Sequence, residues 1–150
     1  MSDALTLREA TADDLPAVLA LYAQPGMNDS GVIDLDQAQA IFAQFARYPN
    51  YRLWVACDAQ GEVIGSYALL VMHNLAHMGT PAAVVEDVVV HPQHRSQGIG
   101  RQMMEHARTM ARAAGCYKLA LSSNQQRTRA HAFYESLGFE RHGISFVINP

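Results

Sequence analysis

Two carboxylates interrupt an apolar, β-branched segment, because Glu86 and Asp87 stand among the valines of residues 84–90. A carboxylate in such a segment is costly unless it has a partner or a chemical role. Either one could take a proton from a nucleophile as a general base. Neighbouring side chains of a regular strand point to opposite faces, so we expect at most one of them to face a substrate. We favour Glu86, and a carboxylate that merely bonds a neighbouring loop is the alternative.

The next segment is rich in glycine and could bind an anion. A polar turn at residues 91–94 leads into Arg95, Ser96, Gln97, Gly98, Ile99, Gly100 and Arg101, after which a helical pattern begins. Glycine lets the backbone approach a ligand closely, and the free N–H groups at a helix start attract negative charge. We therefore predict a pyrophosphate site on the amides of residues 96–101. A Walker loop would need Lys-Ser or Lys-Thr after the second glycine, and a dinucleotide fingerprint would need glycine at Met103.

Apolar periodicity and turn residues predict the elements that position these groups. The expected strands are 5–8, 51–57, 63–73, 84–90, 117–121, 139–141 and 145–148. The expected helices begin at Thr11, at Asp34 or Asp36, after Gly100 and at Thr128. The order β-α-α-β-β-β-α-β-α-β-β predicts an α/β fold with a mixed, largely antiparallel central sheet flanked by helices. We expect one domain over residues 1–150.

Two motifs carry a family resemblance. A Val-rich strand followed by R-x-x-G-x-G resembles the acetyl-coenzyme A signature of the GNAT superfamily of N-acetyltransferases. The later run Phe133-Tyr134-Glu135-Ser136-Leu137-Gly138-Phe139 resembles a second motif of the same superfamily. The resemblance implies a GNAT-like fold, acetyl-CoA as co-substrate, and acetyl transfer to an amine.

The resemblance also implies roles for individual residues. Tyr134 would protonate the departing thiolate, and a carboxylate at Glu86 would act as base, directly or through water. Backbone N–H groups of Val88, Val89 and Val90 would contact the cofactor, often beside a β-bulge. Many relatives carry Asn where this chain has Arg127, so either Asn124 or Arg127 would contact coenzyme A.

The acceptor is predicted only in outline. The segment from Ser122 to Tyr134 resembles aminoalkylphosphonate acetyltransferases, and Glu86-Asp87-Val88 resembles glucosamine-6-phosphate acetyltransferases. These resemblances imply a small primary amine with an anionic group, which Arg127 or Arg129 could bind. They also imply a homodimer that pairs through the final apolar segment. A peptide acetyltransferase and a non-catalytic acyl-CoA-binding module are the alternatives. Residues 25–33 and 74–81 are the expected acceptor loops.

Bulk properties narrow the class of protein. The chain has 150 residues, a formal net charge of -3 and 17% charged residues, which does not favour nucleic-acid binding. No apolar run is long enough to cross a membrane, and the start does not resemble a signal peptide, so we expect the cytoplasm. Cys57 and Cys116 form neither a metal motif nor a disulfide framework. His91 and His94 lack the further ligands of a zinc site, so we predict no metal.

Overall fold

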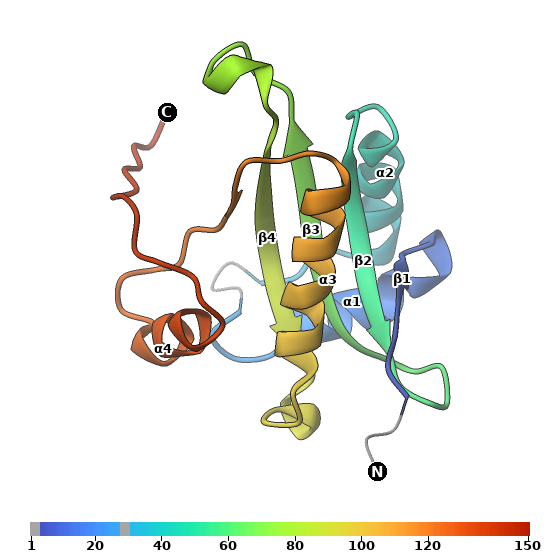
Figure 1. Ribbon diagram of the computed structural model, residues 1–150. Coiled ribbons are helices and arrows are strands. Elements are labelled where there is room, and N and C mark those ends of the chain that lie inside the picture. Colours follow the sequence, from blue (N-terminus) through green and yellow to red (C-terminus); the bar gives the residue numbers. More distant parts are fainter. Residues whose placement is uncertain (1–3, 28–30) are drawn as a thin grey trace. The chain divides into compact units, whose positions relative to one another are not determined.

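The computed structural model describes residues 4–27 and 31–150 and has a mixed α/β fold (Figure 1). Its helices and strands, in chain order, are β1 Thr6–Glu9, α1 Leu15–Tyr22, α2 Leu35–Phe45, β2 Tyr51–Cys57, β3 Val63–Met72, β4 Ala82–Val90, α3 Ile99–Ala113, β5 Leu119–Ala120 and α4 Thr128–Ser136. The chain divides into two compact units, one that ends at Ala120 and one that spans Leu121–Pro150.

The first unit contains a five-stranded sheet in the order β1-β2-β3-β4-β5. Every neighbouring pair is antiparallel except β4 and β5, which are parallel. Helices α1 and α2 cover one face of the sheet and α3 covers the other (Figure 1). The predicted mixed, largely antiparallel sheet is therefore confirmed.

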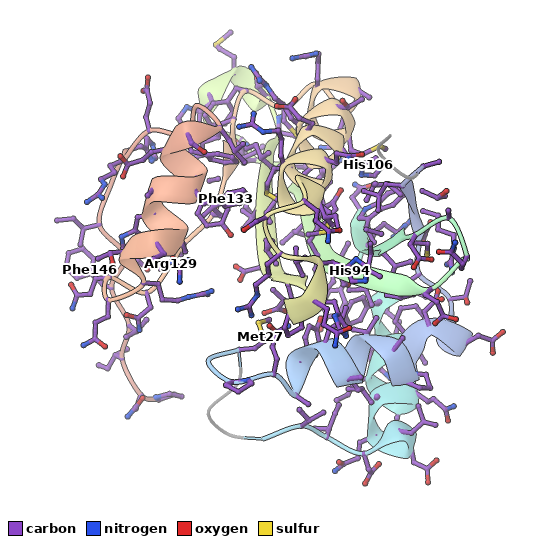
Figure 2. All side chains as sticks on the ribbon, turned by 90° about the horizontal axis from the view of Figure 1, so that it is seen from below. Met27, His94, His106, Arg129, Phe133 and Phe146 are labelled. Carbon is purple, nitrogen blue, oxygen red and sulfur yellow. The ribbon has the colours of Figure 1, made fainter. Side chains whose placement is uncertain are left out.

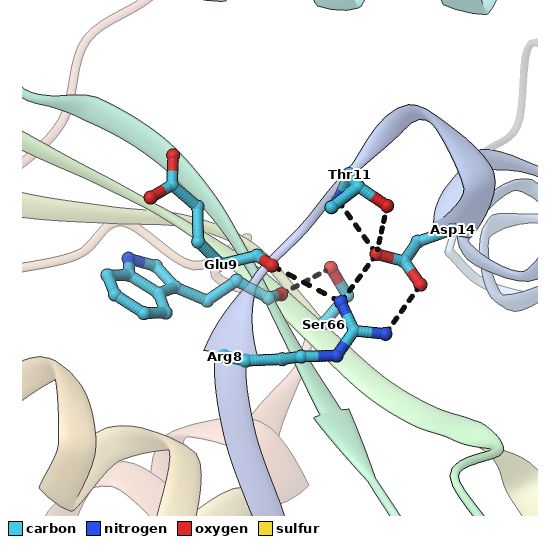
Figure 3. Close-up of polar contacts among 6 residues, drawn as sticks. Arg8, Glu9, Thr11, Asp14 and Ser66 are labelled. Carbon is cyan, nitrogen blue, oxygen red and sulfur yellow. Dashed lines mark hydrogen bonds and ion pairs between the residues drawn. The ribbon is translucent and has the colours of Figure 1, made fainter.

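A charged corner fixes the entry into α1 (Figure 3). The Arg8 guanidinium donates two hydrogen bonds, of 2.7 and 2.8 Å, to the carboxylate of Asp14. The same carboxylate accepts the backbone N–H of Thr11 at 2.7 Å, so Thr11 marks the start of the short 3-10 turn Ala12–Asp14, as predicted. Asp14 is buried, and Arg8 holds the pKa of its carboxyl below the usual value. The pair therefore joins β1 to the first helix with the charge compensated.

Helix α3 packs closely against β3. Gly65 of β3 lies so close to this helix that an added Cβ would stand 3.0 Å from the sulfur of Met103. Met103 and Tyr67 are fully buried there. Met103 and Met104 of α3 therefore pack in the core.

A buried hydrogen bond on this face predicts pH-dependent stability. The hydroxyl of Tyr67 lies 2.5 Å from Nδ1 of His106, which lies on α3 (Figure 2). Burial raises the pKa of Tyr67, so the phenol keeps its proton and donates it to the neutral imidazole. Burial also lowers the pKa of His106 below 6.5. Protonation of His106 would remove the acceptor of a fully buried hydroxyl, at a cost of about 1–3 kcal/mol.

We expect this contribution to be complete above pH 6.5 and to be lost as the pH falls toward the lowered pKa of His106. Urea unfolding at pH 7 and pH 5 measures it. The variant His106→Gln keeps an acceptor but does not titrate, so it should lose less stability than the wild type between these two values. Parallel losses in the two proteins would show that His106 does not carry the effect.

The second unit contains α4 and a long segment without regular structure. Gly138 follows the end of α4 and has a left-handed φ of 94°. The predicted strands at 139–141 and 145–148 are wrong, because residues 139–150 form no strand. The predicted strand 117–121 shortens to Leu119–Ala120. A strand requires a hydrogen-bonded neighbour, and the second unit contains none for the apolar segment 144–148.

Among the described residues, no helix combines the length and the apolar character needed to span a bilayer.

Candidate active site

The predicted glycine loop lies between β4 and α3. A 3-10 turn, Pro92–His94, follows β4, and α3 begins directly after Gly98. Ser96 and Gly98 have left-handed backbones, with φ of 62° and 80°. An added Cβ at Gly98 would meet nothing within 4 Å, so glycine is needed there for its backbone conformation rather than for space.

The loop presents a row of unused hydrogen-bond donors. Within residues 4–27 and 31–150, no backbone carbonyl accepts the N–H groups of residues 96–101. The first intrahelical bond of this end runs from Gln102 N to Gly98 O, at 3.0 Å. Free amides at a helix start, with the positive end of the helix dipole behind them, suit a phosphate group. Arg95 and Arg101 are exposed and add positive charge beside these amides.

Strand β4 carries a β-bulge at Asp87. Glu86 pairs with Ala68 and Val89 pairs with Ser66, so two residues of β4 stand opposite the single residue Tyr67. Asp87 has a left-handed φ of 54°. A bulge of this kind interrupts the alternation of side chains and twists the strand. The bulge that the family resemblance implies is therefore present in this strand.

The bulge interrupts the alternation on which the expectation of opposite faces for Glu86 and Asp87 rests. Both side chains are exposed. Burial raises the pKa of Tyr51, and the charges of Asp87 and then Glu86 raise it further. Partial burial also raises the pKa of Glu86, with a smaller contribution from Asp87. Strict alternation does not hold because Asp87 turns out of the regular strand conformation.

The charges of these carboxylates act on two tyrosines, Tyr22 and Tyr51, that the sequence did not single out as site residues. Tyr22 ends α1, and its pKa is raised by burial first and then by the charge of Asp87. Tyr51 begins β2 on the face that α1 and α2 cover, where its ring stacks on Phe45 at 4.5 Å. Each tyrosine falls in an apolar pattern, so the sequence offers no signal that separates it from core residues.

One edge of β4 has free backbone groups beyond the bulge. The backbone N–H of His91 donates toward β3, whereas the carbonyl of Val90 accepts a side chain on the opposite edge. Because successive residues of a strand alternate their hydrogen-bonding direction, the N–H groups of Val90 and Val88 point away from β3. On the edge away from β3, β5 pairs with Ala83 and Val84. No described strand pairs with residues 85–90 on that same edge. Val88 and Val90 can therefore donate to a ligand, whereas Val89 is buried and faces β3.

The remaining predicted residues lie in the second unit. Asn124 closes a turn, where its side chain accepts Gln126 N at 2.9 Å and its carbonyl accepts Arg127 N at 2.9 Å. His131 Nε2 lies 2.8 Å from the same carbonyl. Arg127 precedes α4 and Arg129 lies in its first turn, and both are exposed. None of these bonds involves the guanidinium group of Arg127 or Arg129, so both groups can contact a ligand.

Tyr134 lies on α4 and is half-buried. Its ring packs against Phe133 and Phe139, with centroids 5.2 and 5.7 Å away. Burial raises the pKa of Tyr134 above 10, and Arg127 opposes part of that shift. The phenol is therefore protonated at neutral pH and can act as an acid.

The predicted acceptor loops are only partly described. Residues 28–30, in the middle of the predicted loop 25–33, lie outside the described residues. In the second loop, the Asn74 side chain donates to Thr80 O at 2.6 Å and closes the segment. Leu75 and Met78 are fully exposed at its tip. This loop therefore presents an apolar tip rather than charged groups.

No cluster suited to a metal ion appears in the part of the chain that the structure describes. His91 Nδ1 accepts the backbone N–H of Gln93 at 3.1 Å, and the ring of His94 (Figure 2) stands edge-on to it at 5.5 Å. These two imidazoles close the turn before the glycine loop.

Comparison with known proteins identifies the family. Residues 15–139 match the model of the acetyltransferase (GNAT) family. An aminoalkylphosphonate N-acetyltransferase from Salmonella typhimurium is 33% identical over 141 residues, which cover 94% of this chain and 88% of that protein. A glucosamine 6-phosphate N-acetyltransferase from Trypanosoma brucei brucei is 34% identical over 82 residues. That match covers 55% of this chain and 54% of that protein, so it spans about half of the relative's length.

A solved structure agrees in fold. A proposed acetyltransferase from Agrobacterium tumefaciens str. C58 superimposes with a TM-score of 0.88 and 34% identity, over 97% of this chain and 99% of that one. The two predicted resemblances, to glucosamine-6-phosphate and to aminoalkylphosphonate acetyltransferases, are confirmed at the level of the family. The chain belongs to the acetyltransferase (GNAT) family and is an acyltransferase.

Proposed function

We propose that the chain transfers the acetyl group of acetyl-CoA to the primary amine of a small acceptor by direct attack. The observation that carries the proposal is the continuity of donors from the free edge of β4 to the amides of residues 96–101. A thioester on the strand edge and a pyrophosphate on the loop would then belong to one extended cofactor. The bulge sets Glu86 and Asp87 beside that edge.

The reaction needs a base, a donor to the thioester oxygen, and an acid. Glu86 would accept the ammonium proton. Its pKa is raised toward neutral pH, which suits a general base. The freed nitrogen attacks the thioester carbon, whose oxygen gains charge and is stabilised by the N–H of Val88 or Val90. The new C–N bond forms as the C–S bond breaks. Tyr134 would give its proton to the leaving thiolate, whose reference pKa of about 8.5 lies below that of a phenol.

The negative charges of Glu86 and Asp87 support an acceptor that carries an ammonium group. Asp87 adds a second negative charge, and the phenols of Tyr22 and Tyr51 add hydroxyl groups and ring faces that attract cations. Relatives named for aminoalkylphosphonate and glucosamine 6-phosphate support an acceptor that also carries an anionic group. Arg127 and Arg129 would bind that group, and Arg127 is alternatively a cofactor contact together with Asn124.

We also propose one functional domain, working as a homodimer in the cytoplasm. The family match runs from residue 15 to residue 139 and so includes parts of both units, which supports one domain. Ile144, Phe146, Val147 and Ile148 are between 82% and 97% exposed, which supports pairing with a second copy. Light scattering should give the mass of a dimer, and the monomer mass over a wide concentration range would remove this claim. Cys57 and Cys116 are both free thiols, as a reducing compartment allows.

The test of function is release of free thiol from acetyl-CoA with a panel of acceptors. The panel contains neutral aliphatic amines, the same amines carrying phosphate, phosphonate or carboxylate, amino sugars, and lysine peptides. We expect the anionic small amines to react fastest. Equal rates with neutral amines would remove the anionic acceptor, a preference for peptides would favour the peptide alternative, and no reaction at all would favour a binding module.

Arg127→Ala separates the two roles of Arg127 in the same assay. If Arg127 binds the acceptor, the variant should raise the acceptor KM and leave the acetyl-CoA KM unchanged. A rise in the acetyl-CoA KM alone would assign Arg127 to the cofactor.

A further inference from the structure

Gln24 joins three parts of the first unit through one side chain. It lies two residues beyond α1, and its Nε2 donates to Leu21 O at 2.9 Å and to Val90 O at 3.2 Å. Its Oε1 accepts a hydrogen bond from the guanidinium of Arg95. The end of α1, the last residue of β4 and the first residue of the glycine loop therefore meet at this amide.

The surroundings fix the orientation of the amide. An amide nitrogen can only donate and an amide oxygen can only accept. Two carbonyl oxygens face one end of the Gln24 amide, so its nitrogen must point toward them and its oxygen toward Arg95. The backbone of Gln24 is held as well, because its carbonyl accepts Met27 N at 3.3 Å.

The contact orients Arg95 without neutralising it. The ion pairs of the described residues involve Arg8, Arg52 and Arg141, and not Arg95. A neutral amide therefore restricts a long, exposed cation while its charge stays available to an anion. A carboxylate in place of Gln24 would attract Arg95 more strongly, but it would compete with a phosphate for the same charge.

We propose that Gln24 is a positioning residue for coenzyme A, which holds the Arg95 guanidinium in place for the phosphates of the cofactor. Only the identity of the ligand rests on the proposed function. Binding to an ordered Arg95 costs less conformational entropy than binding to a mobile one, because the arginine side chain is restricted before the ligand arrives.

A double-mutant cycle tests the proposal, with coenzyme A titrated by calorimetry into the wild type, Gln24→Met, Arg95→Met and the double variant. We expect Arg95→Met to weaken binding about tenfold and Gln24→Met to weaken it several-fold. The double variant should bind about as weakly as Arg95→Met alone, because Gln24 acts through Arg95. Fully additive losses, or no loss in Gln24→Met, would overturn the proposal. Gln24→Glu should also weaken binding, although it keeps a partner for Arg95.

Gln44→Met is the control. Gln44 Oε1 accepts Arg47 Nη1 at 3.1 Å at the end of α2, so this variant breaks a similar glutamine–arginine contact away from the glycine loop. It should leave coenzyme A affinity unchanged.

A second measurement does not depend on the ligand. In the protein without coenzyme A, NMR relaxation of the Arg95 Nε–H should report an ordered group in the wild type and a mobile one in Gln24→Met. Equal order in the two proteins would overturn the role of Gln24 whether or not coenzyme A binds. If the wild type does not bind coenzyme A, or if Arg95→Met binds it equally well, the proposed cofactor site fails instead.

Discussion

Tyr134→Phe should slow acetyl transfer on the order of a hundredfold or more while leaving acetyl-CoA affinity nearly unchanged. The change removes one hydroxyl and keeps the ring that packs against Phe133 and Phe139. The departing thiolate then loses its proton donor, whereas the cofactor keeps its binding groups. Single-turnover rates give the chemical step, and calorimetry with acetyl-CoA gives the affinity.

The pH dependence makes this prediction sharper. Burial holds the pKa of Tyr134 above its ordinary value of 10, so the acid form persists through neutral pH. Wild-type activity should fall on the alkaline side only as the phenol ionises, and this limb should be missing from the variant. Tyr48→Phe removes an equivalent hydroxyl from a side chain that is 58% exposed, and it should leave the rate unchanged. If Tyr134→Phe turns over at the wild-type rate, the tyrosine is structural and another acid protonates the thiolate.

Gly98→Val should weaken acetyl-CoA binding about a hundredfold or more and leave the fold largely intact. The φ of 80° at this position is unfavourable for a β-branched residue, so the loop would relax and turn its amides away from the phosphates. Loss of two hydrogen bonds to a charged group, at about 1.5–3 kcal/mol each, would give an effect of this size or larger. Calorimetric titration measures it.

The hairpin turn between β2 and β3 supplies the control. Gly61 has a φ of 84° and, like Gly98, has nothing within 4 Å of an added Cβ. Gly61→Val should therefore lower the free energy of unfolding by a similar amount without changing cofactor affinity. Equal affinity in the wild type and Gly98→Val would remove the loop as the pyrophosphate site.

The bulge at Glu86 and Asp87 could not be predicted from the sequence. Alternation in a strand is a local rule, and it predicts opposite faces for adjacent residues. The bulge is a property of the pair of strands, because its extra residue is defined only against Tyr67 of β3. The sequence therefore identifies the two carboxylates, whereas the pairing of β4 with β3 decides where the alternation is interrupted.

The contacts of Gln24 could not be predicted from the sequence either. It stands in a polar loop segment with no motif around it, 66 residues from Val90 and 71 from Arg95. Only the packing of α1 against the sheet brings these three together. The prediction of the final strands was wrong for a related reason. The apolar residues at 144–148 form a strand only if a neighbouring strand pairs with them.

By itself, the sequence determined the features that depend on neighbouring residues. These are the order of helices and strands up to α4, the start of α2 at one of two aspartates, of which Asp34 caps the helix, and the strand, glycine loop and helix that present free amides. Backbone sterics and hydrogen bonding within a few residues govern all of them. The tertiary structure decided what depends on distant residues: the bulge in β4, its free edge beyond Val84, and the amide that holds Arg95. Each of these requires two segments that only the folded chain brings into contact.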